Sequence, residues 1–74
     1  WLKACLQTAL DRVRKEVRPT TFQAFELLVL REWPIRRVSK LLNQSPNQLS
    51  QNKRRVIQRL RVHLEDLLHD DETP

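Results

Sequence analysis

Apolar residues recur at three- and four-residue intervals along almost the whole chain, and the prolines stand between the periodic segments. This spacing places apolar side chains on one face of a helix. The pattern predicts four helices, near residues 1–17, 21–32, 34–42 and 46–69. The sequence contains no glycine, so its helices must end at proline or at polar turn residues. We expect a single small all-α domain of four helices over residues 1–74.

The first predicted helix ends at Arg18-Pro19. The residue before a proline is pushed sterically out of the helical region, which stops the helix there. Thr20 or Thr21 is then expected to cap the second helix with its hydroxyl. The apolar stripe of the first helix consists of Leu2, Cys5, Leu6, Ala9, Leu10, Val13 and Val17.

The second predicted helix is apolar on nearly all sides, so we expect it to form the centre of the domain. One side carries Phe22, Phe25, Leu28 and Val29, and the stripe is widened by Leu27 and Leu30. Trp33-Pro34 then breaks the chain. A third, short helix follows, with an apolar stripe formed by Ile35, Val38, Leu41 and Leu42.

A tight turn at residues 43–45 separates the third and fourth helices. Asn43 stands where such a turn needs a left-handed backbone, which asparagine tolerates best after glycine. Ser39 is small, as the close approach of two helices requires. Ser45 is expected to cap the fourth helix, and Pro46 suits its first position because no amide donor is needed there.

A short helix, a three-residue turn and a long helix make up the helix-turn-helix pattern, here over about residues 34–69. On the long helix, Leu49, Val56 and Leu60 share one face at about 100° per residue. They belong to a predicted core of Phe22, Phe25, Leu28, Val38, Leu42, Leu49, Val56 and Leu60.

The opposite face of the long helix carries amide, hydroxyl and guanidinium groups. These groups hydrogen-bond to base edges and phosphates in the major groove of DNA. Nine helical residues span about 12 Å, which matches three to four base pairs at roughly 3.4 Å per step. The face therefore predicts a DNA-recognition helix with Asn47, Ser50, Gln51, Arg54, Arg55 and Gln58 as its DNA-binding residues.

Charge is distributed unevenly along the chain. Residues 1–61 hold all fourteen Lys and Arg and only four of the nine acids, and the whole chain has a net charge of +5. Such a basic surface attracts polyanions, of which nucleic acid is the commonest, although a solvated surface or an acidic membrane leaflet would also explain it. Arg59 and Arg61 are expected to pair along their helix with Glu65 and Asp66.

Candidate groups for catalysis or metal binding are sparse. His63 and His69 are six residues apart, so they do not share a helix face as metal ligands do at spacings of three or four. No serine or cysteine has a histidine and an acid at a plausible spacing, and no glycine is present to form a phosphate-binding loop. We expect no enzymatic activity, no cofactor and no bound metal.

The single cysteine, Cys5, cannot form an internal disulfide and lies in an apolar stripe, so we expect a thiol in the core. The longest apolar run, Leu27–Leu30, is much shorter than the roughly 20 residues that span a bilayer. No signal-peptide pattern opens the chain. These observations predict a soluble, cytoplasmic protein with no membrane partner.

From about Ala9 to Leu67 the chain resembles region four of bacterial sigma factors, particularly those of the extracytoplasmic-function group. The order and spacing of the family's short motifs fit without a gap. The positions that carry the resemblance are Ala9-Leu10, Pro19, Phe25-Glu26-Leu27, Arg37-Val38-Ser39, Asn43-Gln44-Ser45, Arg55-Val56 and Leu60-Arg61.

Three positions depart from the family pattern. Arg37 replaces an acidic residue, Asn43 a glycine and Gln44 an apolar turn residue, so the family's preference for a DNA sequence does not carry over. DNA-binding domains of LuxR-type response regulators share a similar four-helix arrangement and are an alternative. A further alternative is a helical protein-interaction module that uses Trp1, Trp33 and the Leu67-Leu68 end.

The resemblance implies binding to the minus-35 element of double-stranded promoter DNA. It also implies docking of an apolar surface on the β flap of the RNA polymerase core, and capture by an anti-sigma factor. By position, it places Gln48, Ser50, Gln51 and Arg54 near bases and Arg37 and Arg55 near phosphates.

Overall fold

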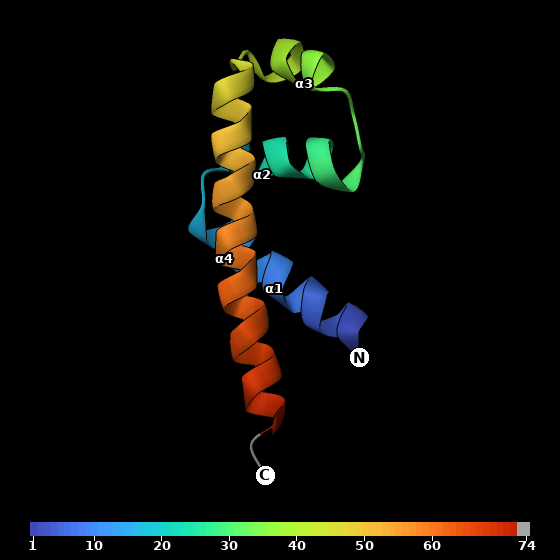
Figure 1. Ribbon diagram of the computed structural model, residues 1–74, viewed down its shortest axis with the longest axis vertical. Coiled ribbons are helices and arrows are strands. Elements are labelled where there is room, and N and C mark those ends of the chain that lie inside the picture. The colour runs from blue at the N-terminus through green and yellow to red at the C-terminus, as the bar shows by residue number, and fades with distance from the viewer. Residues whose placement is uncertain (73–74) are drawn as a thin grey trace.

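The computed structural model describes the backbone of residues 1–72 and the side chains of residues 1–69. Over residues 1–72 it contains four α-helices, one of which continues into a π-helical turn, and no β-strand, which confirms the expected all-α fold. Its dimensions of 48 × 18 × 16 Å reflect the length of the last helix (Figure 1). The elements are α1 (Leu2–Glu16), α2 (Pro19–Phe25), the π-helical turn η1 (Glu26–Leu30), α3 (Ile35–Leu42) and α4 (Pro46–Glu72).

The start of α2 and the end of α4 differ from the prediction. Arg18, in an extended conformation, precedes α2, and no side chain caps the helix, so the expected cap at Thr20 or Thr21 was wrong. Pro19 occupies the first helical position, where its fixed φ is already suitable.

The last helix is longer than predicted. α4 continues to Glu72, three residues beyond the predicted boundary. Residues 73–74 lie outside the described part of the chain.

The π-helical turn changes which apolar residues of the second helical segment are buried. The N–H of Arg31 donates to the carbonyl of Glu26 at 3.0 Å, which closes a five-residue turn. The extra residue rotates the following side chains relative to an α-helix. Leu27, which widened the predicted stripe, is buried, whereas Leu28 is only half-buried and Val29 is 39% exposed, contrary to the prediction.

The core consists of two clusters placed one after the other along α4. Leu49 and Val56, seven residues apart and both 0% exposed, each anchor one cluster. The short α2 lies between them and supplies residues to both. One cluster contains Leu10, Val13, Phe22, Phe25 and Val56, with Val17, Ile57 and Leu60 packed against it. The other contains Ala24, Leu27, Val38 and Leu49, with Leu28, Trp33 and Leu42 packed against it.

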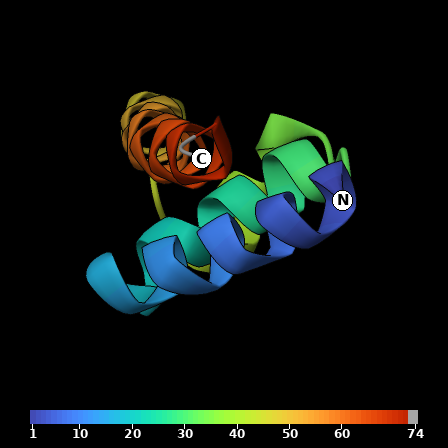
Figure 2. The same cartoon turned by 90° about the horizontal axis from the view of Figure 1, so that it is seen from below.

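The first half of α1 is much more exposed than its periodicity predicts. Trp1 and Leu2 are 66% and 67% exposed, and Cys5 is half-buried rather than part of the core. Figure 1 shows the reason, because α1 diverges from α4 toward the N-terminus. In Figure 2, which looks along α4, α1 and α2 lie side by side on one side of that helix.

Leu41, predicted in the apolar stripe of the third helix, is 57% exposed, and α3 contacts the core through the buried Val38 and through Leu42. None of the helices within the described residues is long and apolar enough to cross a membrane.

Candidate nucleic-acid interface

The turn that precedes α4 is held by three hydrogen bonds to one residue, Ser39. Asn43 adopts the left-handed conformation, with φ 55° and ψ 46°, as predicted. The N–H groups of Asn43 and Gln44 both donate to the carbonyl of Ser39, the latter at 3.2 Å. The Ser39 hydroxyl in turn donates to the carbonyl of Gln44 at 2.5 Å. Ser39 therefore contributes a hydroxyl as well as the small size expected from the sequence.

Gln44 connects this turn to the second turn of α4. The Nδ2 of Asn52 donates to the Oε1 of Gln44 at 2.9 Å, and both side chains are half-buried. A polar side chain is tolerated at this half-buried position because it has a hydrogen-bond partner.

Ser45 and Gln48 cap the start of α4 reciprocally. The N–H of Gln48 donates to the Ser45 hydroxyl at 3.2 Å, and the N–H of Ser45 donates to the Oε1 of Gln48 at 2.9 Å. This is a capping box, in which two side chains each satisfy an unpaired backbone donor. The predicted cap at Ser45 is confirmed, and the structure adds Gln48 as its partner.

The eight predicted DNA-binding residues are all solvent-exposed. Seven lie on the first half of α4, on the side away from the buried Leu49 and Val56, and one lies on α3. Within α4, successive polar residues therefore present their side chains to solvent over three turns. The eight are Arg37, Asn47, Gln48, Ser50, Gln51, Arg54, Arg55 and Gln58.

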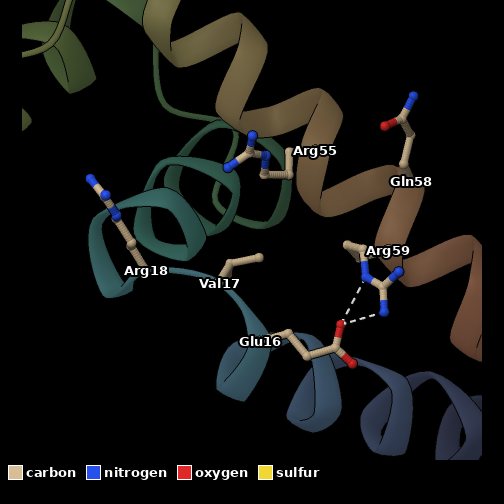
Figure 3. A pocket seen from close by; sticks show the side chains of 6 residues that line it. All are labelled: Glu16, Val17, Arg18, Arg55, Gln58 and Arg59. Atoms are coloured by element: carbon tan, nitrogen blue, oxygen red, sulfur yellow. Dashed lines mark hydrogen bonds and ion pairs between the residues drawn. The ribbon is translucent and has the colours of Figure 1, made fainter.

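The outer face of α4 is a ridge between surface hollows. On one flank, a hollow of about 340 Å³ is lined by Ser50, Lys53, Arg54, Ile57, Gln58 and Arg61. On the other flank, a hollow of about 680 Å³ is lined by Glu16, Val17, Arg18, Arg55, Gln58 and Arg59. Arg54 and Arg55 are adjacent in sequence but line hollows on opposite flanks of α4, because consecutive helical residues are about 100° apart. We call the second of these the Arg18/Arg55 hollow (Figure 3).

A third hollow lies between the turn and α2. Its volume is about 330 Å³, and it brings Gln48 and Gln51 together with polar residues of the turn and of the second helix. The residues that line it are Arg18, Thr20, Thr21, Asn43, Gln44, Gln48, Gln51 and Asn52. The ends of α2 and α3 therefore add polar groups beside the face of α4 that the sequence singles out.

Arg37 is the one predicted residue that the structure keeps apart from these hollows. Its guanidinium lies 4.0 Å from the centroid of the Trp33 ring. Stacking on an indole face restricts a guanidinium but leaves its N–H groups directed outward. Arg37 lines none of the three hollows described above.

Sequence reasoning missed Arg18, which lines two of the hollows. In the sequence it marks only the end of the first helix, since it precedes Pro19. In the structure it lies beside Arg55 in one hollow and beside Gln48 and Gln51 in another. No local pattern identifies this role, because it depends on how the link between α1 and α2 packs on α4.

Glu16, at the end of α1, forms an ion-pair cluster with two residues of α4. Arg59 donates from Nε at 2.8 Å and approaches with Nη2 at 2.7 Å, both to one carboxylate oxygen. The Nε2 of His63 contacts the other oxygen. The expected pairing of Arg59 with Glu65 or Asp66 is wrong, because α1 supplies a carboxylate that was not adjacent in sequence.

The hydrogen bond from Arg59 is the main reason that the pKa of the Glu16 carboxyl is lowered, and the contact with His63 acts in the same direction. His63 is mostly buried, and its Nδ1 has no hydrogen-bond partner. Among the described side chains, no group of three or more His, Cys, Asp and Glu is placed to hold a metal ion.

Comparison with protein-family models, with curated proteins and with solved structures finds no match for this chain.

Proposed function

We propose that the chain is a sequence-specific domain for double-stranded DNA, with α3, the turn and α4 acting as a helix-turn-helix. The observation that supports the proposal best is the exposed polar face of α4, which lies opposite the fully buried Leu49 and Val56. The left-handed Asn43 and the capping box at Ser45 fix where that face begins. Amides and guanidinium groups on a single helix face match the donors and acceptors of a major groove.

The residues of this face divide into two proposed roles. Arg54 and Gln51 point outward, where a guanidinium pairs with guanine O6 and N7 and an amide pairs with adenine N6 and N7. Arg55 lies on the flank toward α1 and contacts backbone phosphates. Arg37, held on Trp33 near the start of α3, is proposed for a second phosphate contact.

We further propose that the domain acts as region four of a sigma factor, in the cytoplasm. In that role it binds the minus-35 promoter element, docks on the β flap of the RNA polymerase core and is available to an anti-sigma factor. The support for this role is the series of matching motifs from Ala9 to Leu67. The turn supplies a substitute for the family's glycine, because Asn43 adopts the left-handed conformation required there.

The roles of Arg54 and Arg55 provide the test. Arg54→Ala should weaken the free energy of binding to the preferred DNA site by roughly 1 to 3 kcal/mol, because a bidentate base contact is lost. It should also relax the sequence preference at one base pair. Arg55→Ala should weaken all duplexes by nearly the same factor and flatten the dependence of log affinity on log salt by about one unit. Binding is measured on a set of single-base-substituted duplexes at several salt concentrations.

Two outcomes would contradict the proposal in different ways. If Arg55→Ala altered sequence preference and Arg54→Ala weakened all duplexes alike, α4 would enter the groove with a different rotation. If neither variant changed binding to a duplex that the unmodified protein binds, the outer face of α4 would not be the DNA-binding surface.

A helical protein-interaction module is the second candidate, favoured by the exposed apolar side chains at the start of α1. Trp1 and Leu2 are each about two-thirds exposed. Trp33, by contrast, is half-buried under Arg37 and offers little apolar surface. A mobility-shift series over salt separates the two candidates, because specific binding with a steep salt dependence requires phosphate contacts. A LuxR-type domain would also bind DNA, and binding to RNA polymerase core distinguishes it from a sigma factor.

A further inference from the structure

The Arg18/Arg55 hollow contains more positive charge than its neighbours neutralise. Three guanidinium groups and one carboxylate line it. Glu16 is committed to Arg59, through contacts of 2.7 and 2.8 Å. Within the described residues, neither Arg18 nor Arg55 makes a hydrogen bond or an ion pair through its guanidinium. The guanidinium groups of Arg18 and Arg55 therefore line the same hollow without an acidic partner.

Both arginines project from backbone that the core holds in place. Arg55 precedes Val56, which is 0% exposed and belongs to the cluster formed with Phe22 and Phe25. Arg18 follows Val17, which packs against the same cluster, and its carbonyl accepts the N–H of Phe22 at 3.0 Å. Because both anchors pack in or against the core, we expect little backbone ordering to be needed when the two side chains contact one ligand.

The arrangement of the side chains separates the two free arginines from the neutralised one. In Figure 3, Arg59 turns toward Glu16 at one end of the hollow, while Arg55 reaches from α4 toward the link that carries Arg18. Guanidinium groups are planar forks that match the oxygens of a phosphate. Such a hollow is therefore suited to bind a phosphate group, which can approach it freely from solvent.

We propose that Arg18 and Arg55 together clamp one backbone phosphodiester of duplex DNA in this hollow, on the flank of the groove that α4 enters. This inference rests on the proposed DNA-binding function and deepens it. Arg18 comes from the link between α1 and α2, outside the helix-turn-helix. The clamp therefore connects the first two helices to the DNA and fixes the rotation of α4 about its own axis.

The test measures duplex affinity against salt for Arg18→Ala, Arg55→Ala and the double variant. The clamp needs both arginines, so the loss of either one returns the phosphate to its counterions, and the loss of both returns no second phosphate. Each single variant should flatten the log-log slope by about one unit, and the double variant should also flatten it by about one unit. For one lost phosphate contact, the ratio of the unmodified protein's duplex affinity to that of the variant should fall about 3.5-fold between about 50 and 200 mM salt.

Arg12→Ala is the matched control, since Arg12 is an exposed arginine one turn before Glu16 and does not line the hollow. It should leave the slope unchanged. Arg18→Lys should restore the slope but not the full affinity, because it keeps the charge and loses the fork. Far-ultraviolet circular dichroism establishes that each variant retains its helices.

Several results would overturn the clamp. Additive flattening, by about two units in the double variant, would mean two separate phosphates. An unchanged slope for Arg18→Ala, or an equal effect of Arg12→Ala, would remove Arg18 from the contact. Saturable binding of inorganic phosphate at Arg18 and Arg55, followed by arginine side-chain NMR signals and without an effect of either variant on duplex binding, would indicate a free-anion site. If the unmodified protein bound no duplex, the proposed function itself would fail.

Discussion

The capping box at the start of α4 is the local structure on which the proposed recognition helix depends most directly. Ser45→Ala removes the oxygen that accepts the N–H of Gln48, while the bond from the Ser45 N–H to Gln48 Oε1 remains possible. A serine cap replaced by alanine costs about 0.5 to 2 kcal/mol of stability. The bond lost here is 3.2 Å long and exposed to water. We therefore expect the lower half of that range, about 0.5 to 1 kcal/mol.

For a domain of 74 residues, 1 kcal/mol corresponds to roughly 4–8 °C in Tm. Ser45→Ala should therefore melt about 2–8 °C below the unmodified protein. Ser45→Asp is the control, because aspartate is an equally good cap, and its Tm should be close to that of the unmodified protein. Urea unfolding followed by circular dichroism should give a lower midpoint with an unchanged m value, since the surface exposed on unfolding is the same.

Gln48 allows capping and DNA recognition to be separated. Its Oε1 is occupied by the N–H of Ser45, and glutamate can make the same bond. Gln48→Glu should retain or raise the Tm, because a negative charge in the first turn of a helix is favourable. If α4 binds DNA as proposed, the same substitution should weaken duplex binding, since it adds a negative charge beside a polyanion. Gln48→Ala should lower the Tm instead.

Equal melting temperatures for Ser45→Ala and the unmodified protein would refute the energetic role of the cap. A Gln48→Glu protein that melts below Gln48→Ala would refute the reciprocal bond. If Gln48→Glu kept its stability and bound DNA as tightly as the unmodified protein, the first turn of α4 would lie away from the DNA.

Three further predictions concern stability. Leu49→Ala should cost about 2 to 5 kcal/mol in urea unfolding, because Leu49 is fully buried, whereas Leu41→Ala at an exposed site should stay within about 0.5 kcal/mol. Asn43→Ala should lower the Tm and Asn43→Gly should not, since φ is 55° there and a β-carbon costs about 1–2 kcal/mol in that region. The pKa of Glu16 is lowered in the folded protein, so its stabilisation is complete above the unfolded value of 4.5 and is lost as pH falls through the folded pKa. The Tm difference between the unmodified protein and Glu16→Gln should therefore shrink as the pH is lowered below 4.5, and a constant difference would count against the ion pair.

Local signals in the sequence were sufficient for the main architecture. Proline boundaries and helical periodicity located all four helices to within a few residues, because both act within one turn of the chain. The conformation of Asn43 and the cap at Ser45 followed from residue chemistry alone, and both are present. The solvent exposure of the eight candidate residues also followed, since it is the complement of the buried stripe on each helix.

The features that could not be predicted depend on a change of register or on distant segments. The π-helical turn has no distinct composition, so the exposure of Val29 was not foreseen. Glu16 and Arg59 are separated by 43 residues and meet only because α1 packs across α4. Arg18 joins the candidate interface for the same reason. The exposure of Trp1 and Leu2 likewise reflects how far α1 diverges, which periodicity does not encode.

The length of α4 also turns the uneven charge of the chain into an electric dipole. The 27 residues of this helix extend about 40 Å, and its sequence places five Lys and Arg up to Arg61 before five acids from Glu65 onward. The two sets have equal and opposite formal charge, and the backbone dipole of the helix points the same way. Near a polyanion, a domain with this dipole experiences a torque before contact, which turns the basic end of α4 toward the polyanion. Encounters would then begin with the capped end of α4 in front, at a rate that falls as salt shortens the range of the field.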